Sequence, residues 1–247
     1  SGAEARIRDI LCAVFSKGTM RDCEYLNLLD ERRNIVPVFS IEGAAEQTDR
    51  RRGEGVSAVL SGAMDRLKEK GVLFGASITV TSENLHAVTE PRFLAELRNR
   101  GCGLVFFLEY VPVSAGTEYL ALDEENIEAL AGAVAALKRG IRDMILLSFP
   151  GDEAAMGGCL ASGRGFFHIN ASGGAEPCPF SPYAKHSLRT SSMLEVLRSD
   201  YFARLRAMAR DAGPHPGGCT LFGLEDQLAA LYGPRRGLSQ KHDASTH

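Results

Sequence analysis

Short apolar runs rich in β-forming residues alternate with segments of helical periodicity between residues 11 and 148. The strand-like runs cover residues 11–16, 34–41, 72–81, 104–111 and 144–148. Between them, apolar residues recur at helical spacing, as in Val56, Leu60, Met64 and Leu67. This alternation is typical of βα units around a parallel sheet. Five such units predict an incomplete barrel or an open parallel sheet, with chemistry expected at the carboxyl ends of the strands.

The pattern changes after Pro150 to glycines, cysteines and short elements, which predicts a domain boundary there. We expect an α/β fold: a partial (β/α) TIM-like barrel of parallel strands over 1–150 and a small Cys-containing α+β domain over 151–235. The polar residues 236–247 are predicted to be disordered.

The composition excludes several classes of protein. The net charge of −3, without a basic stripe bearing aromatics, gives no reason to expect nucleic acid. The basic run Arg50 to Arg52 is predicted to begin a solvated helix. No apolar run is long enough for a membrane span, and no signal peptide is visible at Ser1. Six irregularly spaced cysteines favour the reducing cytoplasm and a metal or cluster site over a disulfide framework.

Three cysteines carry the strongest chemical signal. Cys159 and Cys178 surround a predicted strand at 166–169 and a glycine turn at 172–174, and Cys219 follows later. A hairpin of this kind brings both sulfurs to one end, as in zinc and iron–sulfur sites. The alternative is three inert, buried cysteines. A fourth ligand would come from water, a substrate atom or one of four side chains: Asp152, His168, His186 and His215. His168 fits a hydrogen-bonded core histidine better, whereas His215 lies in a turn close in sequence to Cys219.

The strand ends are unusually polar. The candidate ligand-binding residues there are Gly18, Thr19, Ser40, Glu42, Ser77, Thr79 and Asn84. Glycine lets the backbone approach a ligand closely. Hydroxyl groups can bind ribose or carboxylate, and Glu42 can accept hydrogen bonds from hydroxyls or an amine. Each of these features taken alone is also common in ordinary turns and helix caps.

Several of these runs resemble the radical S-adenosylmethionine (radical SAM) superfamily. FSKGT at 15–19, VFSIEG at 38–43 and GASITVTSEN at 75–84 resemble strand ends that line its S-adenosylmethionine pocket. SGAEA at 1–5, with Gly2 and Glu4, resembles the motif that holds the amino group of that cofactor, although Ala3 and Ala5 depart from it.

The cysteine region resembles the SPASM/twitch-type members of the same superfamily. The resemblance rests on the Cys159-x13-Gly173-x4-Cys178 spacing, on GRGFFHIN at 163–170 and EPCPF at 176–180, and on a following helix at 192–202. It implies an auxiliary 4Fe-4S cluster held by Cys159, Cys178 and Cys219.

One departure is decisive for chemistry. Radical SAM enzymes bind their catalytic cluster through Cys-x3-Cys-x2-Cys, and no cysteines here have that spacing; Cys12, Cys23 and Cys102 are isolated. We therefore expect either a fragment of a radical SAM enzyme acting on a peptide or small molecule, or a protein that kept the scaffold without the chemistry. In both cases residues 1–247 should not cleave S-adenosylmethionine.

A non-catalytic iron–sulfur or zinc module that recruits a peptide or protein is the alternative. An acid–base enzyme using Glu42 and a histidine has no supporting arrangement in the sequence. The strand at 11–16 is expected to be an exposed edge, available for pairing with another chain.

Overall fold

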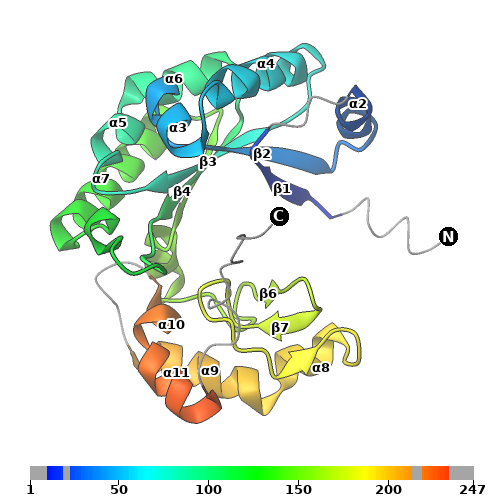
Figure 1. Cartoon of the computed structure of the whole chain (residues 1–247), viewed down its shortest axis with the longest axis vertical. Coiled ribbons are helices and arrows are strands. Elements are labelled where there is room, and N and C mark those ends of the chain that lie inside the picture. The colour runs from blue at the N-terminus through cyan, green and yellow to red at the C-terminus, as the bar shows by residue number, and fades with distance from the viewer. Residues whose placement is uncertain (1–9, 19–22, 213–218, 234–247) are drawn as a thin grey trace, which may run out of the picture. The chain divides into compact units, whose positions relative to one another are not determined.

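The computed structural model describes residues 10–18, 23–212 and 219–233 (Figure 1). The chain divides into two compact units, Ser1–Gly151 and Asp152–His247, called here the N-terminal and C-terminal units. Among the described residues, no helix is long and apolar enough to cross a membrane.

The N-terminal unit alternates strands and helices. Its strands are β1 (Cys12–Ser16), β2 (Ile35–Ile41), β3 (Gly75–Val80), β4 (Leu104–Glu109) and β5 (Ile145–Phe149). Its helices are α2 (Cys23–Glu31), α3 (Ala45–Arg52), α4 (Val56–Glu69), α5 (Leu85–Thr89), α6 (Pro91–Asn99), the 3-10 turn η1 (Glu118–Leu120) and α7 (Glu124–Gly140). A second 3-10 turn, η2 (Gly151–Met156), begins at the end of this unit.

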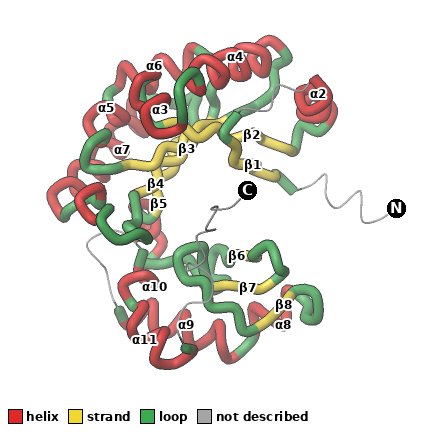
Figure 2. The backbone as a smooth tube through the Cα atoms, in the orientation of Figure 1, coloured by secondary structure: helices red, strands yellow, loops and turns green. Residues whose placement is uncertain are grey.

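The five strands form one parallel sheet in the order β1-β2-β3-β4-β5 (Figure 2). The predicted α/β fold with a partial barrel of parallel strands is confirmed. β1 lies at an edge, as predicted, with Val14 39% and Phe15 52% exposed.

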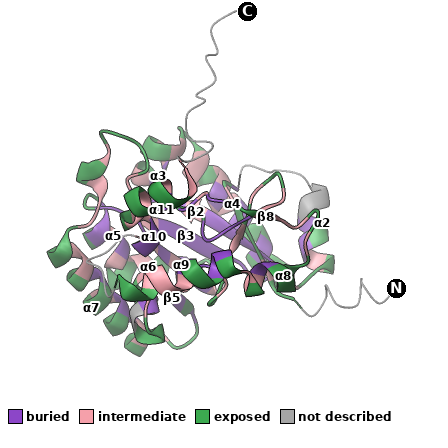
Figure 3. Ribbon diagram, turned by 90° about the horizontal axis from the view of Figure 1, so that it is seen from below, coloured by how far each residue is buried: buried purple, intermediate pink, exposed green. Residues whose placement is uncertain are grey.

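One face of the sheet carries the main core. Ile41, Ile78 and Phe107 are buried there against helix residues such as Leu60 and Leu130. Because side chains alternate along a strand, the intervening residues lie on the opposite face. Figure 3 shows the buried residues concentrated along the central strands β2 and β3, while the outer helix surfaces are exposed.

The basic run was wrongly predicted to begin a helix. Arg50, Arg51 and Arg52 form the last turn of α3, where cations complement the negative end of the helix dipole. The helix begins instead after Ala44, where the Gln47 side chain accepts a hydrogen bond from the Ala44 N–H. The sequence gives no clear signal for this helix start, because the cap position itself holds alanine.

The C-terminal unit has short elements joined by long loops. They are β6 (His168–Ile169), β7 (Gly174–Glu176), β8 (His186–Ser187), α8 (Met193–Arg198), α9 (Asp200–Asp211), α10 (Thr220–Gly223) and α11 (Glu225–Tyr232). The strands form an antiparallel sheet, β6-β7-β8. Its core includes Val196, Phe202 and Leu221.

One local prediction in this unit is confirmed and another is corrected. The glycine turn does reverse the chain, because Gly173 adopts a φ of 85° and its N–H donates to the Asn170 carbonyl over 2.8 Å. The predicted single helix at 192–202 is instead two helices, α8 and α9. Ser199 interrupts it, since this residue is extended and its side chain accepts from the Phe202 N–H as the cap of α9.

Candidate functional site

Three of the predicted hydroxyl residues share one face of the parallel sheet. Ser40 and Ser77 are direct partners in the β2–β3 ladder, and Thr79 follows two residues later on β3. Their neighbours Phe39, Ile41, Ala76, Ile78 and Val80 belong to the helix-side core. The three hydroxyl residues therefore lie on the inner face, opposite the helices, toward the carboxyl ends of the strands.

Asn84 ties these strand ends together. Its side-chain amide donates to the Glu42 carbonyl over 3.0 Å and to the Thr79 carbonyl over 2.9 Å. Its oxygen accepts from the Thr81 N–H over 2.8 Å. Both polar ends of Asn84 are thus used by the protein, so its role here is to hold the β2 and β3 ends in place.

Glu42 is buried and already neutralised. Its Oε2 accepts from Arg51 over 2.7 Å, and its Oε1 accepts from Arg52. The Arg51 guanidinium also lies over the Tyr110 ring, 5.9 Å from its centre. The carboxylate that was expected to accept from a ligand instead anchors two arginines of α3. The sequence pattern does not indicate the pairing of Glu42 with Arg51 and Arg52, because a basic run of this kind is typical of a solvated helix.

The remaining predicted residues of this edge are placed less favourably for a ligand. Gly18 has a φ of 67°, and a side chain there would meet Leu60 and Phe39 of the helix-side core. Its glycine is therefore required by the turn and by packing. Three predicted residues lie outside the described part of the chain: Gly2, Glu4 and Thr19.

An aromatic row on the inner face was not anticipated. The Phe106 ring lies 5.4 Å from Phe15 and 6.2 Å from Phe149, measured between ring centres. The signal was present in the alternation of β4, where Phe106 lies between Val105 and Phe107 of the core. The inner face thus combines hydroxyl groups with an aromatic surface.

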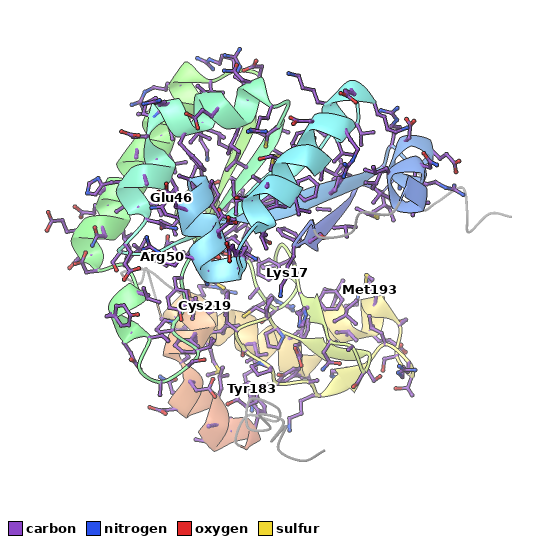
Figure 4. All side chains as sticks on the ribbon, turned by 45° about the horizontal axis from the view of Figure 1, so that its top comes forward. Lys17, Glu46, Arg50, Tyr183, Met193 and Cys219 are labelled. Atoms are coloured by element: carbon purple, nitrogen blue, oxygen red, sulfur yellow. The ribbon has the colours of Figure 1, made fainter. Side chains whose placement is uncertain are left out.

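In the C-terminal unit, two of the three predicted cysteine ligands are in contact. The Sγ atoms of Cys178 and Cys219 lie 3.7 Å apart; Cys219 precedes α10 and is labelled in Figure 4. Cys159 packs against the same core cluster.

The three thiols differ in acidity. Burial raises the pKa of Cys159 to about 11. The hydrogen bond with Cys219 and then burial raise the pKa of Cys178, and the same hydrogen bond lowers the pKa of Cys219. Either thiol can be the donor in this contact.

A complete ligand set is not formed by the described residues, among which no group of three or more His, Cys, Asp or Glu side chains is arranged to hold a metal. The three-cysteine site therefore stays a prediction. Among the proposed fourth ligands, His168 is 39% exposed and bonds Glu176, which makes it less buried than expected. His186 lies 6.2 Å from the Tyr201 ring. Asp152 begins the C-terminal unit within η2, and His215 lies outside the described residues.

No protein-family model matches the chain, and no curated protein matches it. Solved structures do. Native anSMEcpe with bound AdoMet and Cp18Cys peptide matches 80% of this chain at 14% identity, with a TM-score of 0.59. SuiB of Streptococcus suis bound to S-adenosylmethionine matches 82% at 12% identity, with a TM-score of 0.62. SuiB bound to precursor peptide SuiA matches 82% at 12% identity, with a TM-score of 0.57.

The chain spans 60% of the length of the first of these structures and 51% of the other two. At such low identities the likeness shows the fold. The chain therefore shares the fold of two proteins whose structures contain S-adenosylmethionine.

Proposed function

We propose that this chain is the scaffold portion of a radical SAM enzyme that acts on a peptide. The observation that carries the proposal is the fold match over four-fifths of the chain to structures with bound AdoMet and with bound peptide. The hydroxyl-bearing inner face at the strand ends supports it. The peptide substrate is inferred from the same structures.

Ser40, Ser77 and Thr79 are the residues that would hold the cofactor. They fit it because hydroxyl groups can bond ribose and carboxylate oxygens and because the sheet places them on one face. Phe15 and Phe106 add an apolar surface for a purine ring. S-adenosylmethionine, if bound there beside a reduced iron–sulfur cluster, would supply radical chemistry for hydrogen-atom abstraction. The role of the protein residues would be to bind the cofactor and to orient it.

Glu42 and Asn84 act as positioning residues. Glu42 holds Arg51 and Arg52 at the end of α3, and Asn84 joins the β2 and β3 ends through backbone carbonyls. Neither side chain has to contact the cofactor for this role. Their substitution should disturb the pocket through its shape.

Residues 1–247 by themselves should not cleave the cofactor. The sequence contains no Cys-x3-Cys-x2-Cys, and Cys12 and Cys102 lie on separate elements at the start of β1 and before β4. Without a cluster iron to chelate the methionyl amine and carboxylate, binding loses its charge-assisted contacts. We expect a dissociation constant weaker than micromolar and no 5′-deoxyadenosine.

Nuclear magnetic resonance at millimolar S-adenosylmethionine tests the pocket. The amide signals of Ser40, Ser77 and Thr79 should shift, and Ser77→Ala should reduce these shifts. Ser114→Ala, in an exposed loop, is the matched control. Shifts confined to other surfaces would contradict the pocket, and micromolar binding by calorimetry would contradict the predicted weakness. The upstream coding sequence decides whether a cluster motif belongs to the same polypeptide.

A non-catalytic metal module is the second candidate, and the Cys178–Cys219 contact favours it. Two thiolates on one tetrahedral zinc, each with a Zn–S bond of about 2.3 Å, stand roughly 3.8 Å apart. The observed 3.7 Å fits that geometry, whereas the auxiliary cluster would place each thiolate on its own iron. Such a module would recruit a peptide or protein partner. Metal and sulfide analysis after anaerobic reconstitution separates zinc from a 4Fe-4S cluster.

A further inference from the structure

The C-terminal unit contains a polar cavity of about 730 Å³. Its wall includes Glu176, Lys185 and Tyr232, together with hydroxyl residues such as Ser187 and Thr190. This volume lies within the range of about 300–1,000 Å³ that is usual for ligand pockets. All the lining residues belong to the C-terminal unit.

The acidic group in this wall is buried. Glu176 is 6% exposed. Its Oε1 accepts from the Asn170 side chain over 2.7 Å, and its Oε2 lies 2.8 Å from Nδ1 of His168, its cross-strand partner. No lysine or arginine among the described residues pairs with it. Each carboxylate oxygen has two lone pairs, so each retains room for a second donor.

The two buried carboxylates, Glu42 and Glu176, have different partners. Glu42 is 3% exposed and each of its oxygens bonds an arginine. Buried charges are normally paired, because desolvation without a counter-charge is strongly unfavourable. Glu176 has an amide and an imidazole instead, at the edge of a space large enough for a ligand.

We propose that this cavity binds a cation, an ammonium or guanidinium group that hydrogen-bonds Glu176. Asn170 and His168 hold the carboxylate in place and leave lone pairs for the ligand. The cation would supply the positive charge that the protein itself provides at Glu42.

The rest of the wall favours a peptide as the carrier of the cation. The Lys185 ammonium lies 5.4 Å from the centre of the Tyr232 ring, and hydroxyl groups line the same space. A lysine- or arginine-bearing peptide has carbonyl oxygens for Lys185 and amide groups for the hydroxyls, whereas a simple amine offers only the cation. The peptide source rests on the proposed function; the cation site itself does not.

Calorimetric titration of the whole chain tests the site with three probes: Ac-Gly-Lys-Gly-NH2, the same peptide with acetylated lysine, and butylammonium. The lysine peptide should bind at least tenfold more tightly than its acetylated form, and more tightly than butylammonium. Glu176→Gln should remove this preference. Asp226→Asn, an exposed carboxylate on α11, should leave it unchanged.

Lys185→Gln tests the same site through an expected gain in binding affinity, whereas Glu176→Gln tests it through a loss. For butylammonium, which has no carbonyl oxygen for Lys185, loss of this like charge should tighten binding about threefold, which damage to the fold would not do. Equal binding of the charged and acetylated peptides, or the same affinity in Glu176→Gln, would overturn the cation site. Equal binding of butylammonium and the lysine peptide would overturn the peptide source. The whole chain is titrated with its metal content unchanged and without S-adenosylmethionine, so failure here is distinct from failure of the proposed function.

Discussion

The two units bury polar groups in different ways. In the N-terminal unit, five parallel strands and their helices enclose a continuous apolar core, and Glu42 is neutralised within it by two arginines. In the C-terminal unit the strands have only two or three residues, and the core includes Tyr183, Tyr201 and Cys178. The hydroxyl of Tyr183 donates to Glu225 over 2.6 Å, and that of Tyr201 to the Tyr183 carbonyl.

The two units therefore differ in what stabilises them. A regular ladder with an apolar layer is stable without external groups. Strands of two or three residues bury too little to be stable by themselves, so the C-terminal unit depends on side-chain hydrogen bonds and, in our proposal, on ligated cysteines.

Cys178→Ala should have the largest effect. If metal ligation is coupled to folding, its loss should destabilise the C-terminal unit by more than about 5 kcal/mol in the metal-loaded protein. Bound iron or zinc should disappear as well. Amide hydrogen exchange of β7 and α9, with and without chelator, measures the change. Cys102→Ala, at a buried cysteine of the N-terminal unit, is the control and should keep the metal; an unchanged metal content in Cys178→Ala would refute the site.

The two buried carboxylates should respond unequally to removal of their charge. Glu42→Gln should lower the free energy of unfolding by about 3–5 kcal/mol, because it leaves the arginines beside it without a counter-charge. Glu176→Gln should change it by less than about 1 kcal/mol, because its partners are an amide and an imidazole. Denaturant unfolding of both variants measures the difference. Similar losses would show that Glu176 is paired as strongly as Glu42.

The buried Cys102 thiol should make the folded protein less stable at alkaline pH. Burial raises the pKa of its thiol to about 11 from the ordinary value of 9.0. The unfolded chain therefore releases this proton at lower pH, and stability should fall by about 2–3 kcal/mol as the pH rises from 9 to 11. Cys102→Ala should lack this component. Parallel pH dependence of unfolding in both proteins would contradict the shift.

Ser199→Ala should have the smallest effect. Its hydroxyl accepts from the Phe202 N–H and caps α9. Removal of such a cap costs about 1 kcal/mol. Thermal unfolding followed by circular dichroism measures it, with Ser114→Ala as the control. A loss equal to that of the control would show that the break between α8 and α9 does not depend on this cap.

The sequence by itself determined the strand and helix alternation of residues 11–148, the hairpin turn at Gly173 and the parallel sheet. These features follow from local periodicity and from backbone preferences, which neighbouring residues encode directly. It also pointed to Ser40 and Ser77, which the register of adjacent strands brings together.

Only the tertiary structure decided which charges meet. Arg51 and Arg52 lie nine and ten residues from Glu42, and their pairing depends on how α3 packs after β2. Glu176 finds His168 and Asn170 across a hairpin, and no arginine reaches it within the described residues. Local patterns carry little information about such pairs, because the partner of a buried charge is chosen by three-dimensional packing and by the free energy of desolvation.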